Sequence, residues 1–229
     1  MSTIDPAVRH DLTDAQWALL KPLVPPASRI GRPRQWPVRG LVDGVRHRVR
    51  TGCPWRDVPD RYGPWWRVYA LFACWQLLGV WGGVEAALRE AADTAGKLSW
   101  QVSVDSTTAR AHIHAAGARR DSVERVVGEP DHHALGRSRG GWGTKTHAAV
   151  DQHRGVLSFL PTPGQDGDSP QFITVLEQIR IARPGAGRPR QRPERVLADK
   201  AYSSRANRAW LRRHKIAATI PVPADQAGH

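Results

Sequence analysis

Two aspartates adjoin short apolar segments, and they are the residues of this sequence that most directly suggest chemistry. Asp105 lies within residues 100–110, a run of β-branched and apolar residues that predicts a strand. Asp199 directly follows residues 195–198, which predict a short buried strand. Aspartate is a poor strand former, so Asp105 needs a compensating role, and binding a metal ion would supply one. Two carboxylates at strand ends can share one such site.

Capping is the ordinary alternative for each aspartate. An aspartate side chain commonly accepts backbone N–H bonds where a strand ends or a helix begins. For Asp105 or Asp199 taken singly, capping is the simpler interpretation. Together they form a pattern that the rest of the chain must support or weaken.

The overall charge of the chain indicates a polyanionic partner. Its 229 residues include 34 Lys and Arg against 21 Asp and Glu, which gives a formal net charge of +13. An excess of this size favours nucleic acid over a merely solvated basic surface. With 40% hydrophobic residues, the chain can also bury a core, in one large domain or two small ones.

Cysteine usage and hydropathy bear on the compartment. Cys53 and Cys74 show no CxxC spacing, so neither a disulfide framework nor a cysteine-based zinc site is indicated. Residues 1–6 lack the apolar core of a signal peptide, and no window reaches eighteen apolar residues. We therefore expect a cytoplasmic, nucleoid-associated protein with no membrane partner. A zinc site would have to draw on irregularly spaced histidines, which argues against it: His112, His114, His132, His133, His147 and His153.

Residues 1–96 predict a small all-α domain of helix-turn-helix-like organisation that binds DNA. Thr13 and Gln16 have the spacing of a capping box at the start of the first helix. Apolar residues at helical intervals predict three more helices, at residues 38–50, 65–78 and 84–92. Thr51-Gly52 should end the first of these three.

Basic side chains are concentrated in this domain. Between residues 29 and 61, nine arginines face three aspartates. This local excess fits binding to duplex DNA. The linker at residues 28–34 suits an arm lying along phosphates or in a minor groove, although an ordinary solvated linker would look the same.

Residues 97–229 predict a domain of the α/β class. The expected order after the Asp105 strand is a long insertion or flexible loop at 115–141, a hairpin of strands at 144–150 and 156–160, a helix begun by Ser169 and Pro170, the strand at 195–198, a helix at 205–215 and a strand at 217–221. One aspartate then lies in the first strand and the other at the end of the fourth.

The sequence resembles the DDE transposases of bacterial insertion sequences, specifically insertion-sequence family five, over nearly the whole chain. The resemblance is carried by residues 12–17 (LTDAQW), 51–59 (TGCPWRDVP), 104–107 (VDST), 143–147 (GTKTH), 162–165 (TPGQ) and 198–202 (ADKAY). It implies a ribonuclease-H-like catalytic domain, preceded by the helical domain. It also maps the family's first and second catalytic aspartates onto Asp105 and Asp199.

The resemblance implies metal-dependent cleavage and strand transfer of DNA at element ends. Two Mg²⁺ (or Mn²⁺) ions, held by Asp105 and Asp199, would activate the attacking oxygen and stabilise the leaving one. Water would attack first at the element's end, and the freed 3′-OH would then attack target DNA. The implied partners are the terminal inverted repeats and target DNA, bound by a homo-oligomer.

The chain departs from the family pattern near its C-terminus. The family's third acid is a glutamate on a helix after the last strand, whereas the last acid here, Asp225, lies in a proline-containing tail. We expect either that frameshifting joins a further segment carrying this glutamate or that the chain is a decayed remnant. The alternative function is therefore an inactive, truncated transposase that binds element ends as a regulator. DNA binding without metal-dependent nicking would distinguish it from the enzyme.

Basic residues in both domains are candidate DNA contacts. Between residues 187 and 215, ten basic residues face two acids, which favours phosphate contact over a solvated face. His147 and Tyr202 are further candidates near the predicted active site, although a Tyr at a strand end is more often merely exposed. The candidate DNA contacts are Arg32, Arg34, Arg46, Arg48, Arg50, Lys145, Lys200, Arg205, Arg208 and Arg212.

Overall fold

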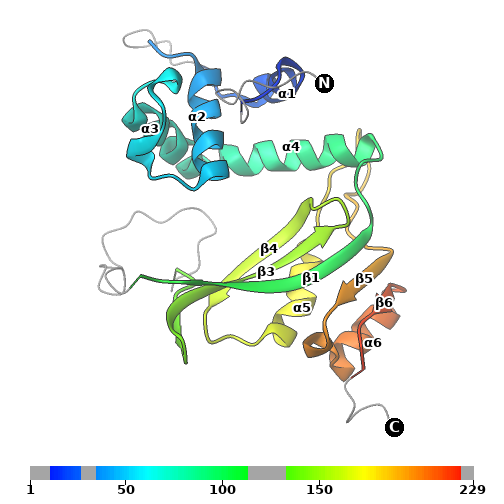
Figure 1. Cartoon of the computed structure of the whole chain (residues 1–229). Helices are drawn as coiled ribbons and strands as arrows, with labels where there is room; N and C mark the ends of the chain where they lie inside the picture. Colours follow the sequence, from blue (N-terminus) through cyan, green and yellow to red (C-terminus); the bar gives the residue numbers. More distant parts are fainter. Residues whose placement is uncertain (1–10, 27–34, 113–132, 223–229) are drawn as a thin grey trace, which may run out of the picture. The chain divides into compact units, whose positions relative to one another are not determined.

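The chain divides into two compact units, Met1–Glu85 and Ala86–His229, here called the helical unit and the sheet unit. The structure is a computed structural model, and it describes residues 11–26, 35–112 and 133–222. Figure 1 shows the helices and strands along the chain. Helix α4 (Val80–Thr94) contains the junction between the units. The domain boundary predicted after residue 96 stays a prediction.

The helical unit is built from short helices around one apolar cluster. Its elements before α4 are α1 (Asp14–Leu20), η2 (Lys21–Leu23), α2 (Val38–Thr51), η3 (Trp55–Asp57), η4 (Asp60–Tyr62) and α3 (Trp65–Leu77). The cluster joins Val42 and Val45 of α2 to Val68 and Leu71 of α3. Gly44 permits this close packing, because a Cβ there would lie 3.0 Å from the Tyr62 Cβ and 3.1 Å from the Val68 methyl groups.

Two helix ends follow the chemistry expected from the sequence. The Thr13 hydroxyl accepts from the Gln16 backbone N–H at 3.2 Å, and the Gln16 side chain accepts from the Thr13 N–H at 3.0 Å. This confirms the predicted capping box at the start of α1. Helix α2 ends at Thr51, and Gly52 takes a left-handed conformation with φ 72°, as expected for a glycine after a helix.

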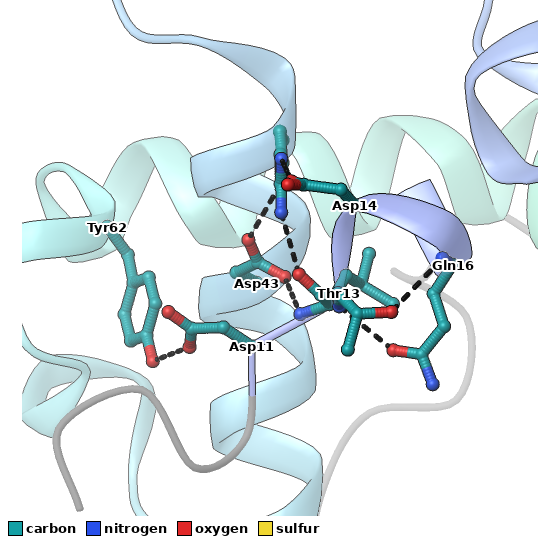
Figure 2. Close-up of polar contacts among 8 residues, drawn as sticks. Asp11, Thr13, Asp14, Gln16, Asp43 and Tyr62 are labelled. Atoms are coloured by element: carbon teal, nitrogen blue, oxygen red, sulfur yellow. Dashed lines mark hydrogen bonds and ion pairs between the residues drawn. The ribbon is translucent and has the colours of Figure 1, made fainter. Parts of the chain in front are cut away.

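A set of polar contacts fastens residues 11–14 to α2, and we call it the N-terminal clamp (Figure 2). The buried Asp43 carboxylate accepts from the Leu12 N–H at 2.8 Å. Arg39, one turn earlier on α2, donates to the Leu12 carbonyl at 2.7 Å and to the Asp14 carboxylate at 2.6 Å. The clamp therefore gives hydrogen-bond partners to the Leu12 N–H and carbonyl, which packing against α2 removes from water.

Tyr62 makes a second contact with this segment. Its hydroxyl donates to the Asp11 carboxylate and accepts from the Arg61 guanidinium at 2.6 Å. Burial, followed by the hydrogen bond to Asp11, raises the pKa of Tyr62 to about 12. The phenol therefore stays protonated and can donate at any ordinary pH.

The sheet unit is a mixed sheet with helices packed on it, which confirms the predicted α/β class. Its elements are β1 (Gln101–Arg110), β2 (Gly136–Ser138), β3 (Gly141–Asp151), β4 (Val156–Pro163), α5 (Asp168–Glu177), β5 (Arg195–Ala198), η6 (Lys200–Tyr202), α6 (Arg205–Arg213) and β6 (Ala217–Thr219). The strand order is β2-β3-β1-β5-β6, with β4 also beside β3. Strands β1, β3 and β4 are antiparallel neighbours, while β5 is parallel to β1 and to β6.

The core of the sheet unit lies between the sheet and helix α5. Val102 and Val104 alternate along β1 and are almost fully buried, together with Phe172 and Val175 of α5. Trp210 of α6 belongs to the same apolar cluster. Since strand side chains alternate between faces, this burial fixes which residues of β1 lie on the side of α5.

Two expectations about this unit are wrong. Residues 136–138, assigned to a long loop, form strand β2 on β3, which begins at Gly141 and not at 144. This glycine-rich stretch has no apolar period, but backbone pairing needs none.

The second wrong expectation concerns the start of helix α5. The helix begins at Asp168 with Gly167 as N-cap, so Ser169 is not the cap. An acid in the first turn is favoured by the helix dipole.

No single helix in the described parts of the chain is long and apolar enough to cross a membrane. Helices α3 and α4 meet the criterion only when taken together, and they are bent by 77° at the break between them.

Candidate active site

The parallel pairing of β1 with β5 brings the two predicted catalytic aspartates together. Its last paired residues are Val104 and Ala198. Asp105 and Asp199 each come one residue later, so their backbones lie about one strand spacing, roughly 5 Å, apart. Both aspartates are solvent-exposed. Two residues that are distant in the sequence thus directly follow the paired ends of neighbouring strands.

Each aspartate also makes one local hydrogen bond. The Asp199 Oδ1 accepts from the Ala201 N–H at 2.9 Å and caps η6, so the capping interpretation holds for this residue. The Asp105 Oδ1 accepts from the N–H of Ser106 at 2.7 Å. One such bond occupies one of the two carboxylate oxygens. Capping and metal binding are therefore compatible at both positions.

A polar cluster lies on the α5 side of β1, next to this aspartate pair. It comprises Ser106, Lys145, His147, Asp168 and Tyr202, and we call it the α5 polar cluster; His147 and Tyr202 are buried and the other three are half-buried. The Lys145 Nζ lies 3.1 Å from the Asp168 Oδ1 and donates to the Asp166 carbonyl at 2.8 Å. The His147 Nδ1 lies 3.7 Å from the same Asp168 oxygen, and its Nε2 lies 3.0 Å from the Thr162 hydroxyl.

Ionisation within the cluster follows from its contacts. Burial raises the pKa of Asp168, but hydrogen bonds from the Ser106 and Lys145 side chains outweigh this, and the net shift is downward. Burial lowers the pKa of His147, assisted by the Lys145 charge and opposed by that of Asp168. At neutral pH the cluster therefore holds an ionised Asp168 beside a neutral His147.

Tyr202 does not lie at the surface, which corrects the expectation for a Tyr at a strand end. It is 2% exposed, because η6 turns its ring into the core, 5.5 Å from the Phe172 ring. Burial and the charge of Asp168 raise its pKa to about 12; Asp105 and Asp199 also raise it, and Ser106 lowers it. The phenol is therefore a permanently protonated group among three carboxylates.

The aspartate pair fits a divalent cation as a partial ligand set. Within residues 11–26, 35–112 and 133–222, no three His, Cys, Asp or Glu side chains are placed to hold a metal ion together. Mg²⁺ commonly takes only one or two carboxylates and completes its octahedron with water and substrate phosphates. Asp105 and Asp199, exposed and adjacent, offer this kind of incomplete set.

The predicted DNA contacts of the helical unit differ in their surroundings. Arg32 and Arg34 lie outside the described residues. Arg50 is exposed and Arg46 is half-buried. Arg48 is half-buried with its guanidinium 5.1 Å from the centroid of the Trp55 ring, so it also has a packing role.

The predicted contacts of the sheet unit fall into two groups. Lys200, Arg205 and Arg212 are exposed. Lys145 is engaged by Asp168 and Asp166, as described above. Arg208 is likewise engaged, since it donates to the Ser203 hydroxyl at 2.9 Å and to the Ile220 carbonyl at 2.9 Å. The side-chain nitrogens of these last two residues therefore serve contacts within the protein.

Asp168 is the residue that the sequence interpretation missed. It lies in the first turn of α5, next to a segment already noted at residues 162–165. The available signal was an acidic residue two positions before Pro170, at the start of a helix. That signal predicts a helix start, but not contact with β1 and β3.

Comparison with known families agrees with the fold, and it identifies the class of protein as a transposase. Residues 12–84 match a family described as a putative transposase of the IS4/5 family. Residues 97–228, more than half of the chain, match the transposase DDE domain. The chain belongs to the DDE transposase family. Its sheet unit is accordingly of the ribonuclease-H-like type.

Two curated relatives match part of the chain. An uncharacterized protein, y4sN of Sinorhizobium fredii (strain NBRC 101917 / NGR234), is 37% identical over 109 residues, which cover 48% of this chain and 83% of the relative. An uncharacterized 16.2 kDa protein of insertion element IS402 from Burkholderia cepacia is 31% identical over 110 residues, covering 44% and 73% respectively.

A solved structure, the Mos1 transposase in a paired-end complex with the left transposon end, is a distant neighbour. It matches with a TM-score of 0.30 and 14% identity, covering 85% of this chain and 61% of that one. The chain thus spans less than two thirds of the Mos1 protein. A likeness this low supports no detailed comparison. Membership of the family rests on the two domain matches.

DDE transposases cleave phosphodiester bonds and transfer DNA strands with the help of divalent metal ions. The DDE domain match therefore places the chain in an insertion-sequence transposase family that acts on DNA. The aspartate pair lies within this matched region.

Proposed function

We propose that this chain carries out metal-dependent cleavage and strand transfer at the ends of an insertion sequence, with Asp105 and Asp199 as catalytic metal ligands. The observation that supports the proposal is the β1–β5 register, because these two exposed aspartates each come one residue after its last pair. Exposure matters because a DNA phosphate has to reach the carboxylates.

The proposed cofactor is a pair of Mg²⁺ or Mn²⁺ ions, which would supply Lewis-acid stabilisation of the attacking and leaving oxygens in an in-line displacement. Asp105 and Asp199 would hold these ions through carboxylate oxygens. Each aspartate also accepts one local backbone hydrogen bond, Asp105 from Ser106 and Asp199 from Ala201, which limits the motion of its side chain. No covalent bond between protein and DNA is required.

The proposed DNA contacts are electrostatic. Lys200 follows Asp199 directly, and Arg205 and Arg212 lie on α6, all three exposed. Their charges would hold the phosphate backbone beside the aspartate pair. The helical unit, with exposed Arg50, would bind the terminal repeats as duplex DNA. We further propose a homo-oligomer on DNA, in the bacterial cytoplasm and associated with the nucleoid.

The test is a nicking assay on a supercoiled plasmid that carries the genomic DNA flanking the coding sequence of this chain. Asp105→Asn and Asp199→Asn should each lower Mg²⁺- or Mn²⁺-dependent nicking by at least about a hundredfold, because each removes a charged metal ligand. Affinity for the same DNA, measured by fluorescence anisotropy, should change by less than about twofold, since most binding charge lies elsewhere.

Asp57→Asn is the matched control, because it neutralises an exposed carboxylate in the helical unit. This variant should nick at the wild-type rate. Undiminished nicking by Asp105→Asn would remove Asp105 from the mechanism. DNA binding by the wild-type chain with no nicking in either metal would instead support the regulatory role.

A further inference from the structure

The side of strand β1 that faces α5 changes from apolar to polar at the position of Asp105. Val102 and Val104 are buried on this side of β1, and Ser106 continues the same alternation. The cross-strand partners on β3 change in parallel: Val104 pairs with Ala149, and Ser106 pairs with His147. Polar groups thus lie directly behind the peptide that joins Asp105 to Ser106.

Asp168 is the central residue of the α5 polar cluster. It comes from the first turn of α5, and its carboxylate meets the Lys145 ammonium at 3.1 Å. Ser106 lies on the same side of β1, and it contributes to the lowered pKa of Asp168. Lys145 is fixed in turn by the Asp166 carbonyl at 2.8 Å. A single carboxylate therefore links the start of α5 to β3, at the residue that pairs with Thr108 of β1.

Tyr202 is the member of the α5 polar cluster that lies closest in sequence to Asp199. It ends η6, the short helix that Asp199 caps. Its hydroxyl is buried and has no hydrogen-bond partner among the described residues. The same is true of the His147 Nδ1. The Asn207 amide donates to the Tyr202 carbonyl at 3.0 Å and to the Ser169 carbonyl at 3.2 Å, which joins η6 to the start of α5.

We propose that Asp168, paired with Lys145, is a positioning residue. It holds the start of α5 against β3, the strand paired with the Asp105 segment of β1, and Asn207 joins that helix start to the η6 turn after Asp199, so that Asp105 and Asp199 stay adjacent. Adjacent carboxylates repel each other when both are charged, so a restraint on the two segments that carry them favours the arrangement that a cation needs. The α5 polar cluster lies on the other side of β1 and can supply this restraint. The catalytic consequence of this arrangement rests on the proposed function, but the restraint itself does not.

The first measurement is amide hydrogen exchange of the full chain. Asp168→Asn and Lys145→Met should each speed exchange at residues 104–107 and 200–203 by roughly tenfold, because local opening becomes easier when the ion pair is removed. Lys145→Arg keeps the charge and should restore most of the protection. The matched control is Asp93→Asn, since Asp93 bonds Trp100 at 2.8 Å near the other end of β1. It should leave exchange at residues 104–107 unchanged.

The second measurement is the nicking assay on the flanking-DNA plasmid, with rate and DNA affinity determined separately. Asp168→Asn and Lys145→Met should lower kcat about tenfold or more and leave DNA affinity unchanged, whereas Lys145→Arg should recover most of kcat. A fold defect alone would lower both quantities, and it would not be rescued by the arginine variant.

The two measurements separate the two proposals. If the wild-type chain does not nick DNA, the proposed function fails, while hydrogen exchange still decides whether Asp168 restrains the two segments. Unchanged exchange at both segments in folded Asp168→Asn would overturn the positioning role, even if nicking is lost. If Asp168→Asn does not fold, the contrast between Lys145→Met and Lys145→Arg decides the same question.

Discussion

The two units of this protein use aspartates in opposite ways. In the helical unit, Asp43 is buried and accepts the Leu12 N–H, so it fastens one segment to another. In the sheet unit, Asp105 and Asp199 are exposed, and each accepts only a bond from its own neighbourhood. This difference shows that the role of a carboxylate depends on what its oxygens contact. Oxygens that contact distant backbone stabilise the fold, whereas exposed oxygens stay available to a cation.

A second contrast concerns the buried and half-buried acids. Burial raises the pKa of Asp43, and the hydrogen bond from Leu12 and the charge of Arg39 only partly compensate. The pKa of Asp168 is lowered instead, because Ser106 and Lys145 outweigh its burial. The closest nitrogen of Arg39 lies 3.9 Å from Asp43, whereas that of Lys145 lies 3.1 Å from Asp168. The closer cation thus accounts for part of the opposite sign.

The largest stability effect in this comparison is expected for Asp43→Ala. This change leaves the Leu12 N–H without its acceptor inside the clamp, which should cost about 2 kcal/mol of unfolding free energy. Asp105→Ala should change stability by no more than about 0.5 kcal/mol, because the exposed side chain makes only a local bond. Urea denaturation followed by circular dichroism measures both. Equal losses in the two variants would contradict the contrast.

A smaller effect is expected at the start of α1. Thr13→Ala removes the hydroxyl that accepts the Gln16 N–H and should cost about 1 kcal/mol. Thr13→Ser keeps this hydroxyl and should cost almost nothing. The same denaturation experiment decides it. A loss of similar size in the serine variant would show that the Thr13 methyl group, and not the cap, is responsible.

The smallest effect is expected from pH, and its sign should differ between the two acids. The raised pKa of Asp43 means that its contribution to stability is greatest below the ordinary value of 3.8 and falls as pH rises through the raised value. The lowered pKa of Asp168 means that its contribution is present above 3.8 and is lost as pH falls through the lowered value.

Unfolding free energies measured as a function of pH test this difference against matched variants. The advantage of wild type over Asp43→Asn should shrink as pH rises from 3.8. Its advantage over Asp168→Asn should shrink as pH falls from 3.8, and only slightly, because the Asp168 side chain is 31% exposed and solvent screens its charge. Parallel pH dependences for the two pairs would show that the acids are not in different environments.

Local features of the fold could be predicted from the sequence. The capping box at Thr13, the end of α2 at Gly52 and the strand at Arg195–Ala198 were all found where the sequence places them. Each depends on residues within a few positions of one another, whose propensities and hydrogen-bonding groups act locally. An acid within a predicted strand and an acid directly after one were enough to single out Asp105 and Asp199.

Strand register and burial decided the rest. No local pattern shows that Asp168 meets Lys145, that Tyr202 turns into the core, or that Arg208 is used within the protein. Such contacts join residues whose separation along the chain says nothing about their separation in space, and the pairing of β1 with β3 and β5 determines which of them meet. The sequence by itself determined which acids and helices to expect, because propensity is local. Only the tertiary structure decided that Asp105 and Asp199 are exposed next to each other and that Lys145 pairs with Asp168, because register and packing act across the whole sheet.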